Sequence, residues 1–154
     1  MWPWRPRSDS PLPPAQGEVR QGRRADPARE SPSDLGRQGE QLAQNLLRSQ
    51  GLAILASNYR CPGGEADLIA LDASTRKTLG CETLVFVEVK TRSPGQLTLP
   101  QHAVDADKQA QLRKVARYYQ NARNAHDLAV RYDIVAITMQ APAQPEITHI
   151  KGAF

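Results

Sequence analysis

The chain has 154 residues, with 20 Lys and Arg against 16 Asp and Glu, so its formal net charge is +4 at pH 7. This length allows one ordinary domain with a proper core and excludes two sizeable ones. No apolar run reaches the length of a membrane span, and the N-terminus lacks the apolar segment of a secretory signal. We therefore expect a cytoplasmic protein without a membrane partner. The mild positive charge permits a polyanionic partner without requiring one.

The first 32 residues differ in composition from the rest of the chain. They are rich in Pro, Arg, Gly and Ser and show no periodic apolar pattern. This composition predicts a disordered basic tail over residues 1–32 and a folded domain over residues 33–154. The domain's two cysteines, Cys61 and Cys81, are too few and too isolated for a zinc site or a disulfide framework.

The folded domain begins with a helix over Asp34–Gln50, with Ser33 or Asp34 as its N-cap and Gly51 just past its end. One face of this helix carries the small and apolar residues Leu35, Gly39, Leu42, Ala43, Leu46 and Leu47.

Three strands follow. "LAILASNYR" (52–60) is the first, and "CPGG" turns the chain into "EADLIALD" (65–72). After a polar connection over residues 73–82, the third strand is "TLVFVEVKTR" (83–92). The short turns predict an antiparallel meander.

A second helix is predicted over Asp105–Asn124, then a strand in "RYDIVAITM" (131–139) and a short optional strand within "EITHIKGAF" (146–154). The apolar stripe of this helix is Leu112, Val115, Ala116 and Tyr119. The element order α-β-β-β-α-β predicts a single α/β domain, a mixed sheet with flanking helices.

The third strand carries charges that its apolar pattern does not explain. Its alternate residues are apolar on both faces, which is typical of an interior strand covered on both sides. Glu88 and Lys90 nevertheless share one face near its end, and Asp67 lies on the preceding strand among apolar neighbours. If the charged ends of the two strands are adjacent, Asp67 and Glu88 converge on one point.

Two converging carboxylates repel each other unless a cation or a shared proton offsets their charge. Oxygen ligands of this kind suit Mg²⁺ or Mn²⁺ better than zinc. Beside them, Lys90 can orient a water or stabilise charge on a phosphoryl group, so the three residues are the parts needed for phosphodiester hydrolysis. Alternatively, Glu88 and Lys90 belong to a buried polar cluster, or the strand emerges into solvent at this end.

Several motifs in order resemble the YraN family of uncharacterised bacterial proteins. They span about Leu35–Phe154 and read "GRQGEQLAQNLL", "NYRCPGGEADLIA", "LVFVEVKTR", "VDADKQAQLRKVARYY", "RYDIVAI" and "ITHIKGAF". That family is placed in the restriction-endonuclease-like superfamily, which carries the PD-(D/E)xK nuclease motif, and is described as similar to Holliday junction resolvases. The resemblance implies a restriction-endonuclease-like core.

Carried onto this sequence, the motif's aspartate is Asp67, its second acid Glu88 and its lysine Lys90. Glu40 matches an acidic residue that nucleases of this superfamily often place on the first helix, and the resemblance implies a further metal ligand there; a solvated helix glutamate is the alternative. One departure is Ala66, which stands where the motif's name has proline. Glu65, two residues before Asp67, is either a third carboxylate or a solvated residue.

Other residues are candidates for contact with nucleic acid. Thr91 and Arg92 follow the motif and either hydrogen-bond a phosphate or are simply exposed at the surface. Lys108 lies on the core-facing stripe near the start of the second helix, from where it reaches over the sheet or snorkels along it. Arg113, Lys114 and Arg117 lie off that stripe and either track a phosphate backbone or form a solvated face. Asp133 is expected to be a structural pair or a strand-end residue.

These observations favour a Mg²⁺- or Mn²⁺-dependent endonuclease that binds DNA, with a structure-selective enzyme of branched DNA as the closest version by analogy. The rival hypothesis is a nucleic-acid-binding module of nuclease fold without useful turnover. A resolvase that cuts two strands symmetrically acts as a dimer, so a homodimer is expected for the junction version.

Overall fold

The computed structural model describes residues 32–93, 104–140 and 142–154. The tail predicted over residues 1–32 lies outside the described residues, apart from its last residue. The helices are α1 (Pro32–Ser49), α2 (Arg76–Leu79) and α3 (Ala106–Arg123), with a 3₁₀ turn at Ala73–Thr75. The strands are β1 (Ala53–Cys61), β2 (Gly64–Asp72), β3 (Thr83–Arg92), β4 (Ala129–Thr138) and β5 (Glu146–Ile150). None of these helices is both long and apolar enough to cross a membrane.

The five strands form one sheet in the order β1-β2-β3-β4-β5. Neighbouring strands are antiparallel except β3 and β4, which are parallel and are connected through α3. The predicted mixed α/β sheet is confirmed, including the antiparallel meander of the first three strands and the optional fifth strand. β3 is the central strand, as its two apolar faces predicted.

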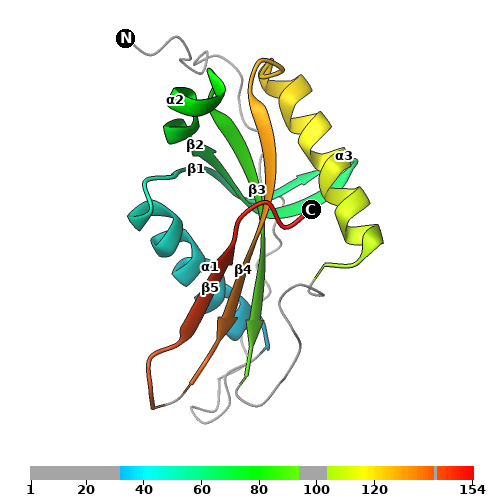
Figure 1. Ribbon diagram of the computed structural model, residues 1–154. Coiled ribbons are helices and arrows are strands. Elements are labelled where there is room, and N and C mark those ends of the chain that lie inside the picture. Colours follow the sequence, from blue (N-terminus) through cyan, green and yellow to red (C-terminus); the bar gives the residue numbers. More distant parts are fainter. Residues whose placement is uncertain (1–31, 94–103, 141) are drawn as a thin grey trace.

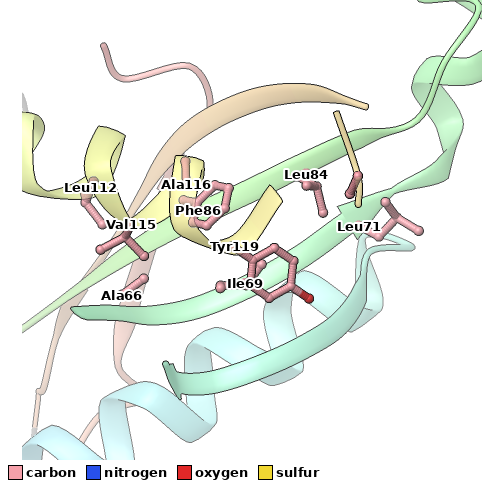
Figure 2. Close-up of a cluster of buried hydrophobic side chains, with 10 residues drawn as sticks. Ala66, Ile69, Leu71, Leu84, Phe86, Leu112, Val115, Ala116 and Tyr119 are labelled. Carbon is pink, nitrogen blue, oxygen red and sulfur yellow. The ribbon is translucent and has the colours of Figure 1, made fainter. Parts of the chain in front are cut away.

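The helices cover opposite faces of the sheet (Figure 1). α3 packs its predicted stripe onto one face, where Figure 2 shows Leu112, Val115, Ala116 and Tyr119 gathered with Ile69 and Phe86 of the strands. On the other face, α1 buries Ala43 and Leu47 against the side chains of β2, β3 and β4, namely Leu68, Ala70, Val85, Val87, Val135 and Ile137. Each helix thereby removes one apolar face of the sheet from water.

Only the C-terminal part of β2 is paired with β3. The pairing runs from Asp72↔Thr83 to Leu68↔Val87, so the two strands separate at Asp67. The Asp67 side chain reaches across this opening, and its Oδ2 accepts a hydrogen bond from the Val89 N–H at 2.7 Å. A carboxylate is therefore held between the two central strands where their ladder ends.

A close approach fixes α1 over the same end of β3. Gly39 is buried, and a Cβ at this position would overlap the Oγ1 of Thr91. Only glycine lets the helix backbone lie this near the strand. Glu40, the next residue of α1, is consequently held close to the opening between β2 and β3.

Some predicted boundaries were wrong. α1 begins at Pro32, so neither Ser33 nor Asp34 is its N-cap; proline suits the first helical turn because its missing N–H would have no partner there. The connection over residues 73–82 contains α2 and a 3₁₀ turn that the sequence did not predict. β4 starts and ends slightly earlier than predicted because its register follows β3 from Thr83↔Ala129 onward.

Candidate active site

Asp67 lies beside a hollow of about 350 Å³ under the first half of α1. The hollow is lined by Leu35, Gly36, Glu40, Asp67, Val89, Lys90 and Thr91. Three of the four residues predicted for catalysis, Asp67, Lys90 and Glu40, thus face one space, although they come from β2, β3 and α1.

Glu88, the fourth, is buried, with 5% of its side chain exposed. Its Oε1 accepts a hydrogen bond from Lys90 Nζ at 2.8 Å. Lys108 Nζ, from the first turn of α3, lies 3.1 Å from its Oε2. That is an ion-pair distance without hydrogen-bond geometry, because Glu88 Oε2 is buried and has no hydrogen-bond partner among the described residues. Glu88 is therefore paired in charge but not fully hydrogen-bonded.

The ionised form of Asp67 is disfavoured by its surroundings. Burial raises its pKa first, and the charge of Glu88 raises it further, to about 6. The hydrogen bond from the Val89 N–H and the charge of Lys108 act in the opposite direction without cancelling these effects. Burial and the neighbouring carboxylates together favour the protonated form of Asp67.

Glu40 adds a further carboxylate at the rim. Its Oε2 accepts a hydrogen bond from Asn58 Nδ2 at 2.8 Å, and its charge also contributes to the raised pKa of Asp67. Asn58 has a positive φ of 51°, which asparagine tolerates better than most residues. Sequence reasoning missed Asn58; its position inside an otherwise regular strand was the available signal.

The donor set fits a divalent cation, although no three carboxylate, histidine or cysteine side chains among residues 32–93, 104–140 and 142–154 are already gathered to hold one. The fit rests on the buried Glu88 oxygen without a hydrogen-bond partner and on the half-buried Asp67 carboxylate beside it. A cation would give this Glu88 oxygen a partner and would offset the charge of Asp67, whose pKa is raised. Carboxylate oxygens are the ligands preferred by Mg²⁺ and Mn²⁺.

The residues predicted to contact nucleic acid lie in different surroundings. Thr91 lines the hollow, Arg92 ends β3, and Lys108 is held at Glu88. Lys114 and Arg117 are exposed on α3. The guanidinium of Arg113 instead lies 5.2 Å from the centre of the Phe154 ring, which stacks on Tyr132, so Arg113 helps to attach the C-terminal segment to α3.

Neither Glu65 nor a second, larger hollow belongs to the acidic cluster. Glu65 is exposed and paired with Arg60 at 3.2 Å, as the solvated alternative expected. A larger hollow of about 590 Å³, lined mainly by apolar side chains, lies near the C-terminal half of α3. It contains none of the predicted catalytic residues, and we favour the smaller hollow because Asp67, whose pKa is raised, lines it.

A second buried acid, Asp133, belongs to a satisfied network. Both its oxygens accept hydrogen bonds from Arg131, at 2.9 and 3.1 Å, and further bonds come from the Gly152 N–H and His149 Nε2, each at 2.9 Å. Arg131 also pairs with Asp72 at 2.9 Å. The structural pair expected for Asp133 is confirmed, while the parts played by Asp72 and His149 were not foreseen.

The fold and site define a class: a mixed α/β protein with an acid-lysine cluster where its two central strands separate. Residues 39–137 match the model of the uncharacterised protein family UPF0102, and the chain belongs to this family. A UPF0102 protein of Pelobacter propionicus is 38% identical over 90% of this chain and 94% of its own length. One of Solibacter usitatus is 43% identical over 82% and 89%, respectively. This membership agrees with the resemblance to the YraN family.

Proposed function

We propose that this protein is a divalent-metal-dependent nuclease with a restriction-endonuclease-like core, acting on DNA. The observation that carries the proposal is the opening between β2 and β3. There burial and the neighbouring Glu88 raise the pKa of Asp67, Lys90 donates a hydrogen bond to Glu88, and Asp67 and Lys90 line one hollow. Ionisable groups perturbed by burial and by like charge are typical of catalytic sites.

Each residue of the cluster has a proposed role in the reaction. Asp67 and Glu88 would hold the ion, and Glu40 would contribute directly or through water from α1. When bound, Mg²⁺ or Mn²⁺ supplies positive charge to phosphoryl oxygens and lowers the pKa of water. Lys90 faces the hollow and donates to Glu88, a position from which its ammonium would orient the attacking water or stabilise charge on the phosphoryl group.

The DNA would approach over the rim of the hollow. Thr91 and Arg92 at the end of β3, with the exposed Lys114 and Arg117 of α3, would contact phosphates. Such contacts contribute affinity that falls with salt and little sequence preference, which suits selection by DNA structure. We place this activity in the cytoplasm, and for a four-way junction we expect two copies of the chain to act together.

A second candidate, a nucleic-acid-binding module of the same fold without turnover, is favoured by one contact. Lys90 and Lys108 already place two ammonium groups on Glu88, so the folded protein does not require a divalent ion to offset that carboxylate. Such a module would bind DNA with the same salt dependence in the presence of chelator.

The decisive experiment is a cleavage panel on linear duplex, single strand, flap and four-way junction, each with Mg²⁺, Mn²⁺ and chelator. We expect cleavage of at least one substrate with metal and none with chelator. Glu88→Ala and Lys90→Ala should each lower the rate by about 100-fold or more, as removal of catalytic groups commonly does. Lys77→Ala, on the exposed face of α2, is the matched control and should cleave like the wild type.

Cleavage that survives in both variants would come from a contaminant or another site and would contradict the assignment. Binding to DNA without cleavage of any substrate, unchanged by metal, would instead favour the binding module.

A further inference from the structure

The two lysines at Glu88 are held differently. Lys90 is two residues away on the same strand, and its ammonium makes a hydrogen bond to Oε1. Lys108 comes from α3, and its ammonium lies near Oε2 without forming one, leaving that buried oxygen without a hydrogen-bond partner in the described part of the chain. The weaker of the two attachments is therefore the one made by the more distant residue.

The backbone of Lys108 is held by a helix cap, while its side chain is partly exposed. Asp105 caps α3, and its Oδ1 accepts a hydrogen bond from the Lys108 N–H at 2.8 Å. Only the four-carbon stem and the ammonium have to rearrange for Lys108 to leave Glu88. The side chain is 21% exposed, so a path toward the surface exists.

We infer that Lys108 is an internal counter-cation of Glu88, which a divalent ion displaces from Oε2 and which is then available to a DNA phosphate. This inference rests on the proposed function. Its physical basis is that the Lys108 ammonium lies 3.1 Å from Oε2, so an ion bound to the same oxygen would lie close to it and the two positive charges would repel each other. The contact of Lys108 with Glu88 and the binding of the ion are therefore alternatives.

Calorimetric titration of Mn²⁺ into the full chain tests this directly. Lys108→Met keeps a side chain of similar length and removes the charge, so we expect Mn²⁺ to bind about tenfold more tightly than to the wild type, since a neighbouring charge shifts such equilibria by at least this factor. Lys108→Arg keeps the charge and should bind Mn²⁺ like the wild type. Lys77→Met is the control for loss of a remote lysine.

A second measurement remains informative if Lys108→Met does not fold. Reductive methylation of wild-type lysines, followed by peptide mass spectrometry, should show that Mn²⁺ increases the labelling rate of Lys108 but not that of Lys77. An unchanged or reduced rate at Lys108 would contradict its release.

The outcomes separate the inference from the proposed function. Tighter Mn²⁺ binding by Lys108→Met supports the inference. If the wild type binds Mn²⁺ and Lys108→Met binds it equally or more weakly, the inference is overturned but the metal site is not. Absence of Mn²⁺ binding by both proteins overturns the metal site, and the counter-cation role with it.

Discussion

Two aspartates in this protein, the buried Asp133 and the half-buried Asp67, have opposite surroundings. Asp133 is fully buried, and donors from Arg131, His149 and the Gly152 backbone satisfy both of its oxygens. Burial alone would raise its pKa, but these hydrogen bonds hold the pKa below its usual value. At Asp67, burial and Glu88 prevail, and the pKa rises to about 6.

The difference indicates which acid serves the fold and which is held for another purpose. A network that satisfies every oxygen stabilises a unique arrangement of strands. A carboxylate whose pKa is raised by burial and by a neighbouring carboxylate costs stability when it ionises, and proteins retain such arrangements mainly at functional sites. The comparison thus assigns Asp133 to structure and Asp67 to function, and the predictions below test both assignments.

The largest effect is expected at Asp133. Asp133→Ala leaves Arg131 without its bidentate partner and the Gly152 N–H without its acceptor, so the free energy of unfolding should fall by about 3–5 kcal/mol. Urea denaturation measures this change. Asp127→Ala, at an exposed position, is the control and should change the value by less than about 0.5 kcal/mol. If the free energy of unfolding of Asp133→Ala falls as little as that of the control, the network is not structural.

The opposite sign is expected at Asp67. Its pKa is raised in the folded state, so the wild type loses stability as pH rises from about 4 through 6, where the buried carboxyl must ionise. Asp67→Asn keeps an acceptor for the Val89 N–H and removes the charge. At pH 8 its free energy of unfolding should exceed that of the wild type by about 1–3 kcal/mol. At pH 4 the two values should be about equal. Urea denaturation at both pH values measures this, and a destabilised variant at pH 8 would reverse the assignment.

A smaller effect is expected at the contact that positions α1 over Asp67. Gly39→Ala forces a methyl group into Thr91 and should lower the free energy of unfolding by about 2 kcal/mol. Gly36→Ala is the matched control on the same helix, because its Cβ meets nothing within 4 Å, and should be stabilising by up to about 1 kcal/mol. Equal stability of the two variants in thermal denaturation would show that the close approach is relaxed in solution.

The smallest effect concerns protons at the acidic cluster. A carboxylate must lose its proton to bind a cation, so Mn²⁺ affinity should fall about tenfold for each pH unit below 6. Calorimetric titration at pH 5, 6 and 7.5 measures this, and the same titration in buffers of different ionisation enthalpy counts the released proton. Affinity independent of pH between 5 and 7.5 would show that Asp67 is not a ligand.

Much of the fold was predictable because burial leaves a periodic pattern. The two apolar faces of β3 identified a central strand, and the stripe of α3 matched the side chains that it buries. The start of α1 was missed because the composition of the tail concealed a helix-compatible Pro32. The short α2 has no buried residue, so it left no pattern to detect.

The acidic cluster was predictable only in part. Asp67, Glu88 and Lys90 were identified because charges interrupt apolar strands, and Glu40 only because of the family resemblance. The partners of these residues depend on register and close approach. Asn58 meets Glu40 across 18 positions, and His149 meets Asp133 across 16, through contacts that no local spacing encodes.

The hydrogen bond from the Val89 N–H to Asp67 Oδ2 has a spectroscopic consequence. A backbone amide that donates to a carboxylate changes its proton chemical shift when the carboxylate is protonated. In a ¹H–¹⁵N correlation spectrum, the Val89 cross-peak should therefore titrate near pH 6 and respond to an added ion, while backbone amides far from the opening remain still. One resonance at the end of a strand ladder would report the ionisation of the cluster without any substrate.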